Sequence, residues 1–200
     1  MDGTLWDSTE VVARAWNAAL RQVGLQFGPL TAADIASIMG LTHEQIRERL
    51  FSELASDSWE RFSDLAYLRE EEFLRREGAV LYAGVAEGLT RLAQSHPLAI
   101  VSNCQKGYIE VFLDWTGLRS LFCDWECHGQ TGLSKGENLK LLCGRQNWTE
   151  ALYVGDTAGD EKAAQEAGCD FLFAAYGFGQ ASPAAPVLSS FDQLLSLVPA

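Results

Sequence analysis

The spacing of apolar and polar residues divides the chain into two parts. From residue 8 to about residue 80, apolar side chains recur every three to four positions, as on one face of an α-helix. The first such face stops at Gly24, and Asp7 with Glu10 forms a candidate capping box at its start. Its apolar positions are Val11, Val12, Ala15, Trp16, Ala19, Leu20 and Val23.

Three further helices are predicted in this part, over residues 32–39, 43–54 and 58–76. The last of these is amphipathic and heavily charged. Its run Arg69-Glu70-Glu71-Glu72 is interpreted as a solvated surface.

From residue 80 onward, short apolar runs alternate with helical patterns. The runs Leu98–Val101 and Ala151–Val154 are apolar throughout, as expected for strands covered on both faces. This alternation predicts right-handed crossovers and a parallel sheet, with functional sites at the carboxyl ends of its strands. Strands are predicted over residues 98–101, 121–125, 151–154 and 171–175, and helices over residues 84–94, 105–115, 136–145, 158–167 and 191–197.

Composition excludes several classes of protein. The 200 residues are 48% hydrophobic and 21% charged, which suffices for a packed core and excludes intrinsic disorder. The net charge of −12 argues against a nucleic-acid partner. No apolar run is long enough for a membrane span, and the polar start MDGTLWDSTE is not a signal peptide.

The cysteines indicate a reducing cellular compartment rather than a metal site. Their number is five, with no Cys-x-x-Cys pair, so reduced thiols in a cytoplasmic protein are the simplest interpretation. Cys123, Cys127 and His128 lie within six residues of one another, but no second group completes a tetrahedral zinc site. A structural zinc site is therefore not expected.

Polar residues capable of binding an anion lie at the predicted turns. Asp2-Gly3-Thr4 combines a carboxylate, a residue that turns freely and a hydroxyl group, which suits a tight turn beside an anion. Ser102-Asn103 directly follows a predicted strand and offers a hydroxyl and backbone amides to phosphate oxygens. Simple helix capping explains the second segment equally well.

Two later segments add charge. Lys135 precedes a predicted helix and could neutralise an anion, although a lone lysine is more often solvated. Asp156 and Asp160 stand four residues apart where a buried strand turns into a helix. Carboxylates that converge at a strand end suit Mg²⁺, whereas capping and compensation of the helix dipole are the alternative explanation.

In their order along the chain, these four segments resemble the motifs of the haloacid dehalogenase superfamily of phosphohydrolases. The set DGT…SN…K…GDTxxD is highly specific, and the resemblance covers essentially the whole chain. Within the superfamily, the chain is most similar to the phosphoglycolate phosphatase and β-phosphoglucomutase-like group. The resemblance implies a Rossmann-like α/β core with a doubly wound parallel sheet, formed by residues 1–8 and 81–200. It also implies an inserted helical cap over residues 9–80, which closes over the site.

The resemblance implies roles for individual residues. Asp2 resembles the general acid and base, and Lys135 resembles the lysine that stabilises the phosphate charge. The residues that resemble the phosphate-binding set are Gly3, Thr4, Ser102, Asn103 and Lys135. The leaving group is expected to meet the loop after Asp7 and the cap face near Trp6, Met39 and Thr42.

The resemblance also implies a Mg²⁺ site. Asp156 resembles a direct ligand, Asp2 resembles the residue whose backbone carbonyl binds the metal, and Asp160 resembles the outer carboxylate that supports the site. The expected substrate is a small phosphorylated metabolite, without nucleic acid or membrane as partner. The expected reaction is hydrolysis of a phosphomonoester through an aspartyl-phosphate, with Asp2 protonating the leaving group.

One residue of the family pattern has no counterpart in the sequence. In the family, the nucleophilic aspartate stands two residues before the position of Asp2, in an apolar strand near the middle of the sheet. We expect residues upstream of Met1 to carry both the strand and the nucleophile. Without this strand, its neighbours would keep unpaired backbone groups beside an open core.

Other functions stay open from the sequence. The main alternative is a catalytically inactive or truncated relative that only binds phosphate, Mg²⁺ or a partner. A phosphomutase fits the motifs although nothing requires it, and a dehalogenase would leave Asp156 and Asp160 without a role. A receiver domain lacks the helical insert. Gly177-Phe178-Gly179 is not followed by the crossover helix and strand of a dinucleotide site.

Overall fold

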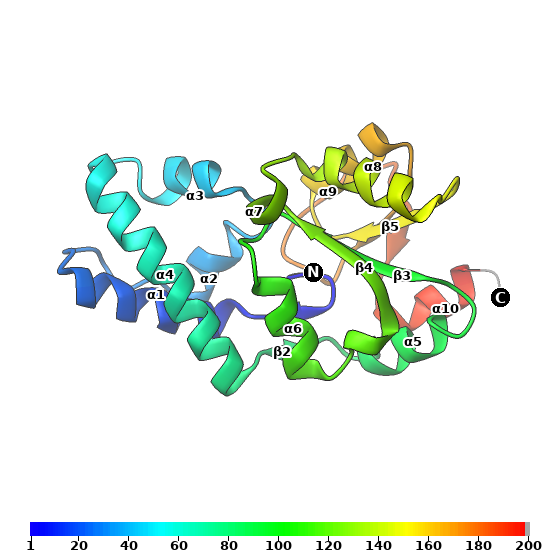
Figure 1. The fold of residues 1–200 in the computed structure, drawn as a ribbon, viewed down its shortest axis with the longest axis horizontal. Helices are drawn as coiled ribbons and strands as arrows, with labels where there is room; N and C mark the ends of the chain where they lie inside the picture. The colour runs from blue at the N-terminus through cyan, green and yellow to red at the C-terminus, as the bar shows by residue number, and fades with distance from the viewer. Residues whose placement is uncertain (199–200) are drawn as a thin grey trace.

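The computed structural model describes residues 1–198, which form a helical part and an α/β part (Figure 1). The helical part contains α1 (Thr9–Val23), α2 (Ala32–Ala36), α3 (His43–Leu50) and α4 (Ser56–Glu77). Helices α1 and α4 pack along each other and enclose aromatic side chains, among which the Trp16 and Phe62 rings meet edge to face.

The ends of α1 agree only in part with the sequence prediction. Gly24 ends the helix with a φ of 73°, a conformation that glycine adopts without the strain of a side chain. The predicted capping box is wrong, because Ser8 is the N-cap and makes no side-chain cap bond. The Asp7 carboxylate instead accepts hydrogen bonds from the amide and hydroxyl groups of Thr9.

The α/β part contains short sheets flanked by helices. Strands β3 (Leu98–Ser102) and β4 (Phe122–Cys127) pair in parallel, as do β5 (Leu152–Gly155), β6 (Asp170–Ala174) and β7 (Val187–Leu188) in that order. Strands β1 (Trp6–Asp7) and β2 (Val80–Leu81) form an antiparallel pair. The helices are α5 (Val85–Leu92), α6 (Tyr108–Thr116), α7 (His128–Thr131), α8 (Lys135–Gln146), α9 (Ala158–Ala167) and α10 (Leu194–Leu197).

The fold class is therefore the predicted one, an α/β protein with parallel strands and a helical insertion. The pair β1–β2, the strand β7 and the helix α7 are not predicted, because elements of two to four residues are too short to show a hydrophobic period. The predicted helix over residues 191–197 begins as a 3₁₀ turn, Phe191–Gln193, before α10.

The two parallel sheets are not paired with each other within residues 1–198. A cavity of 310 Å³ lies between β3 and β5, and its mainly apolar lining includes residues of both strands. The Tyr153 hydroxyl on β5 donates a hydrogen bond to the Val101 carbonyl on β3, 3.0 Å away. No backbone ladder joins β3 to β5 in the described residues, so this side-chain bond is a direct link between the two sheets.

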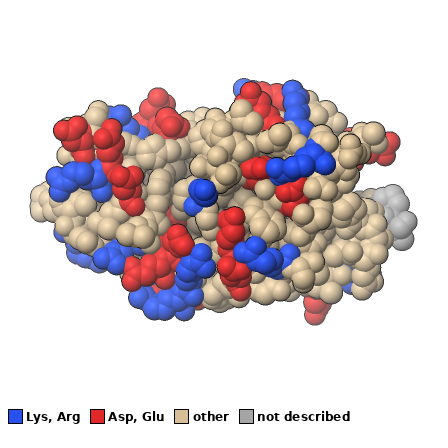
Figure 2. All heavy atoms as spheres, viewed as in Figure 1, with Lys and Arg blue, Asp and Glu red and all other residues tan. Residues whose placement is uncertain are grey.

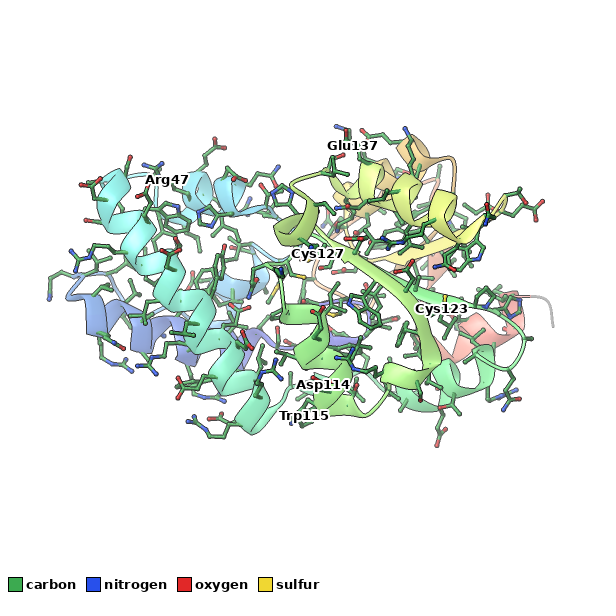
Figure 3. The ribbon with its side chains drawn as sticks, in the orientation of Figure 1. Arg47, Asp114, Trp115, Cys123, Cys127 and Glu137 are labelled. Carbon is green, nitrogen blue, oxygen red and sulfur yellow. The ribbon has the colours of Figure 1, made fainter. Side chains whose placement is uncertain are left out.

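The surface charges, the cysteines and the helices can be compared with the expectations from composition. On the face shown in Figure 2, basic and acidic side chains are intermixed, and Arg145 pairs with Asp124 and Glu126. All five cysteines are free, and Cys123 and Cys127 lie at opposite ends of β4 (Figure 3). In the described chain, no helix is both long and apolar enough to cross a membrane.

Candidate active site

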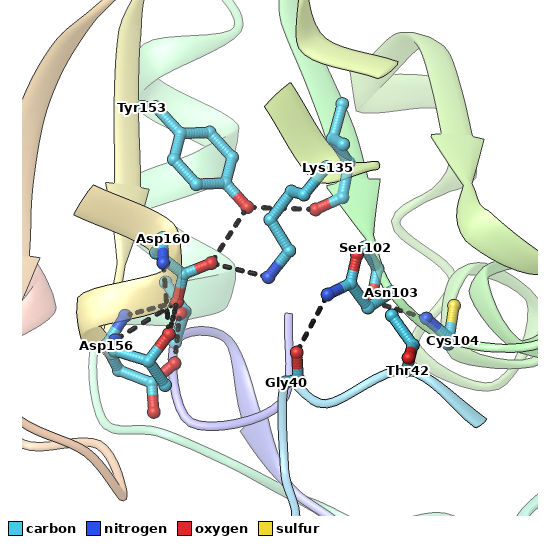
Figure 4. Close-up of polar contacts among 12 residues, drawn as sticks. Gly40, Thr42, Ser102, Asn103, Cys104, Lys135, Tyr153, Asp156 and Asp160 are labelled. Atoms are coloured by element: carbon cyan, nitrogen blue, oxygen red, sulfur yellow. Dashed lines mark hydrogen bonds and ion pairs between the residues drawn. The ribbon is translucent and has the colours of Figure 1, made fainter. Parts of the chain in front are cut away.

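The predicted site residues converge where β3 and β5 end. Ser102 is the last residue of β3, Asp156 directly follows β5, and Lys135 is the first residue of α8. Figure 4 shows the side chains of Lys135, Ser102, Asn103 and Asp156 around one space, with the segment from Gly40 closing it from the helical part. Residues from four distant regions of the sequence thus meet at one edge of the sheets, as parallel topology predicts.

Asp160 is saturated with hydrogen bonds. Its Oδ1 accepts from Lys135 Nζ at 2.6 Å and from the Tyr153 hydroxyl at 3.3 Å. Its Oδ2 accepts from the backbone amides of Asp156 and Thr157 and from the Thr157 hydroxyl. Burial alone would raise the pKa of Asp160, but the Lys135 charge and these hydrogen bonds outweigh it and hold the pKa at about 2. Asp160 therefore fixes the strand–helix turn and Lys135, and its oxygens are already engaged.

Asp156 is held by the first turn of the chain. Its Oδ1 accepts from the Thr4 hydroxyl at 3.3 Å, and its Oδ2 accepts from the Phe178 amide at 2.9 Å. Gly3 has a φ of 74°, and a Cβ atom there would overlap the Asp156 carboxylate, so only glycine permits this approach. Burial, together with the negative charge of Asp160, raises the pKa of Asp156.

Asp2 faces the space between the two parts. Its Oδ1 accepts from the Ser8 hydroxyl at 2.6 Å and from the Tyr108 hydroxyl at 2.8 Å. Burial and the negative charge of Asp2 raise the pKa of Tyr108 far above its ordinary value, so this phenol stays a neutral donor. Two hydroxyl groups thereby orient the Asp2 carboxylate. Ser8 precedes the helical insertion in the sequence, and Tyr108 follows it.

A cavity of 430 Å³ separates the helical part from the ends of the strands. Asp2, Ser102 and Asn103 line it from the α/β part, and helices and loops of residues 12–70 line the opposite side. Two hydrogen bonds join its walls. The Asn103 amide donates to the Gly40 carbonyl, and the Gln105 amide donates to the Glu70 carboxylate.

The three residues expected to contact the leaving group lie at different places relative to this cavity. Met39 lines the cavity, and its contact with a leaving group stays a prediction. Trp6 is fully buried and packs edge to face against Phe112 at a centroid distance of 5.0 Å, so its predicted contact with the leaving group is wrong. Thr42 is not among the described lining residues.

The position of Glu70 corrects the interpretation of residues 69–72 as a solvated surface. The run Arg69–Glu72 is only partly solvated, because Glu70 is just 5% exposed whereas Glu72 pairs with Arg69 at the surface. Glu70 Oε2 accepts from the Trp16 indole at 2.6 Å. Burial raises the pKa of Glu70 to about 7.

The oxygen donors present fit a hard divalent cation such as Mg²⁺. The Asp156 carboxylate is buried beside further acidic groups, and a cation would offset this charge. The Asp2 carbonyl oxygen accepts none of the turn and loop hydrogen bonds found in residues 1–198, which leaves it available to a metal. Within the same residues, no three His, Cys, Asp or Glu side chains form a complete metal site, so the protein side chains described supply only part of a coordination shell.

A family model described as haloacid dehalogenase-like hydrolase matches residues 1–174. The chain belongs to this family. Two curated relatives are both named phosphoglycolate phosphatase. The one from Synechococcus elongatus is 31% identical, with 88% of this chain and 82% of the relative covered. The one from Chromobacterium violaceum is 32% identical, with coverages of 91% and 85%.

Solved structures support the haloacid dehalogenase-like fold. A structure described as a predicted phosphoglycolate phosphatase from Haemophilus somnus superposes with a TM-score of 0.84 at 24% identity, covering 98% of this chain and 94% of that one. A haloacid dehalogenase-like hydrolase from Streptococcus pneumoniae gives a TM-score of 0.83 at 19% identity, with coverages of 98% and 94%. The family and the hydrolase class predicted from the motifs are thus confirmed.

Several residues of this haloacid dehalogenase-like site escape prediction from the motifs. Ser8 and Tyr108 hold Asp2, and Gln105 holds Glu70. Among the segments around the site, only Gly177–Gly179 has a recognisable sequence pattern. Two glycines around one residue indicate that the backbone approaches another group closely. That approach is to Asp156, since a Cβ atom at Gly177 would overlap its side chain.

Proposed function

We propose that this chain is a Mg²⁺-dependent phosphatase that hydrolyses small phosphomonoesters through an aspartyl-phosphate. The observation that carries this proposal is the convergence of Ser102, Lys135 and Asp156 at one edge (Figure 4), with Asp2 and Ser102 in the lining of the 430 Å³ cavity. The relatives named phosphoglycolate phosphatase support the reaction class.

The charge of the site supports a role for a metal. Asp2, Asp156 and Asp160 place three carboxyl groups near a single lysine, Lys135, whose ammonium is already paired with Asp160. A phosphate dianion would be repelled from such a site. When bound, Mg²⁺ would supply the positive charge that holds the phosphate against the attacking carboxylate. Asp156 and the Asp2 carbonyl would hold the metal, and Asp160 would support the site from outside.

The binding of the phosphate and the stabilisation of its charge are assigned to residues of the chain. Lys135 and Ser102 bind the phosphate oxygens, where Lys135 also stabilises negative charge that moves onto them in the transition state. Gly3 and Thr4 form the turn beside the phosphate, and Asn103 borders it.

Asp2 acts as the general acid and base. In this route an aspartate carboxylate attacks phosphorus, and the bond from phosphorus to the leaving oxygen breaks. Asp2 gives its proton to that oxygen and then takes a proton from the water that hydrolyses the aspartyl-phosphate. Ser8 and Tyr108 keep the carboxylate aimed at the cavity.

We also propose that residues 9–80 act as a cap on a core formed by residues 1–8 and 81–200. The cap and core are linked across the cavity by the bonds from Asn103 to Gly40 and from Gln105 to Glu70, and Arg75 of the cap also pairs with Asp114 of the core. Closure would exclude water from the reacting phosphate. A cytoplasmic location fits the five free thiols, which persist in a reducing compartment.

Hydrolysis of p-nitrophenyl phosphate by the protein expressed from its full-length gene, with and without MgCl₂, tests the proposal. We expect metal-dependent release of nitrophenol, and a loss of at least about 100-fold in kcat for Asp156→Asn without loss of the fold. Asp170→Asn is the control, because Asp170 is an exposed aspartate on β6. Undiminished turnover by Asp156→Asn would refute the assignment. Phosphate binding by a folded wild-type chain without turnover would instead identify a relative that only binds.

A further inference from the structure

The charged side chains that line the 430 Å³ cavity are acidic. They are Asp2, Asp64 and Glu70, and neither lysine nor arginine occurs among the lining residues of the described chain. Lys135, which serves the phosphate, lies outside this lining. A leaving group that carries a carboxylate would therefore enter a cavity in which it meets like charge and no basic side chain.

The cavity lining also contains two histidines, His43 and His128, whose neutral rings carry no positive charge. His43 Nε2 lies 3.0 Å from the Trp59 indole nitrogen, and an indole N–H only donates, so this ring nitrogen is an unprotonated acceptor. Burial also lowers the pKa of His43. His128 Nδ1 lies 2.9 Å from the Leu133 carbonyl and must donate to it, which makes Nε2 of the neutral ring an acceptor too.

A second, independent feature is an acceptor that lacks a donor. The Asn103 amide nitrogen donates to Gly40, whereas its Oδ1 atom is buried and has no hydrogen-bond partner in the described structure. Buried polar atoms are rarely left unpaired, so this oxygen calls for a donor from a ligand. Asn103 borders the same cavity as Glu70.

Glu70 gives the cavity its acidic wall. Its oxygens accept hydrogen bonds from Trp16 and Gln105, both neutral donors, and no basic side chain within residues 1–198 pairs with it. Each carboxylate oxygen keeps a second lone pair for a further donor. Aromatic rings of Trp16 and Tyr67 also line the cavity, and such rings attract cations.

We propose that this cavity selects phosphomonoesters whose leaving group carries a protonated amine, with Glu70 as the residue that determines this specificity. The proposal rests on the proposed phosphatase function and names its substrate class, an amino-alcohol phosphate. It separates this chain from its relatives named phosphoglycolate phosphatase, whose named substrate carries a carboxylate. The ammonium supplies the positive charge and the hydrogen-bond donors that the lining lacks.

Competition against hydrolysis of p-nitrophenyl phosphate in MgCl₂ tests this, at pH 8.5, where Glu70 is ionised. Inorganic phosphate, phosphoglycolate and phosphoethanolamine are the competing probes, and their inhibition constants give their affinities. Phosphate reports the binding of the phosphoryl group alone. We expect phosphoethanolamine to bind at least about tenfold more tightly than phosphoglycolate, the ratio for one hydrogen bond to a charged group. Equal affinities, or tighter binding of phosphoglycolate, would overturn the proposal.

Two variants separate specificity from structure. Glu70→Gln should lower the preference for phosphoethanolamine by about tenfold while leaving the affinity for phosphate unchanged. Glu72→Gln, the same change at an exposed position on α4, should leave all three affinities unchanged. Met39→Lys adds the absent cation to the lining and should shift the preference toward phosphoglycolate. An equal loss for all three probes in Glu70→Gln would mean a structural role and would overturn the assignment to Glu70.

The outcomes distinguish this proposal from the proposed function. If phosphate does not bind and p-nitrophenyl phosphate is not hydrolysed, the phosphatase function fails and the specificity proposal fails with it. If phosphate binds and p-nitrophenyl phosphate is hydrolysed but phosphoglycolate is preferred, only the specificity proposal fails.

Discussion

The burial of Glu70 predicts that removing its charge stabilises the protein in alkaline solution. The substitution Glu70→Gln keeps the size of the side chain and its ability to accept from Trp16, but it removes the titration. In the wild type, the carboxyl group is buried without a basic partner, and burial raises its pKa from 4.5 to about 7. The folded state therefore holds the proton over a pH range in which the unfolded chain has released it.

The sign and size of the effect follow from this difference in proton binding. Between pH 4.5 and about 7, the folded protein binds more protons at Glu70 than the unfolded chain does, so the free energy of unfolding falls as pH rises. Each pH unit corresponds to about 1.4 kcal/mol, so the interval amounts to about 3 kcal/mol at most. Above pH 7 the loss is complete, and below pH 4.5 it is absent.

Urea denaturation of both proteins at pH 5, 6, 7 and 8.5, at constant ionic strength, measures the effect. We expect the stability of Glu70→Gln relative to the wild type to rise by about 2–3 kcal/mol across this range. Subtraction cancels the titration of all groups that the variant leaves unperturbed. A difference that stays constant with pH would refute the assignment of a raised pKa to Glu70. Glu72→Gln should show no such trend, because Glu72 lies at the surface beside Arg69.

Two further predictions concern the strand ends. Lys135→Met leaves Asp160 buried without its cation, so we expect a loss of about 3 kcal/mol in urea denaturation at pH 7, partly recovered by adding Asp160→Asn. An unchanged midpoint would contradict the pairing. Gly3→Ala puts a Cβ atom against the Asp156 carboxylate at a positive φ, so metal-dependent turnover of p-nitrophenyl phosphate should fall at least about tenfold, and retention of wild-type kinetics would exclude this close contact.

The sequence predicts those parts of the site that topology brings together. Apolar runs locate β3 and β5, and residues directly after parallel strands must meet at one edge, which is why Ser102 and Asp156 lie near each other. The same logic does not locate partners that come from helix surfaces. Glu70 meets Gln105 only because α4 packs beside the loop after β3, and a charge run in the sequence does not show which of its members turns inward.

The spacing of Asp156 and Asp160 shows why residue type alone leaves chemistry undecided. Four residues apart, two carboxylates at a strand end are compatible both with a shared cation and with helix capping. The structure separates their roles, because Asp160 lies in the first turn of α9, where backbone amides and the Thr157 hydroxyl point at its Oδ2. Lys135 occupies its other oxygen from 25 residues earlier in the chain. Asp156, one residue before that N-cap, accepts only two hydrogen bonds from residues 1–198 and keeps lone pairs free, so the carboxylate with fewer protein partners is the one suited to a metal.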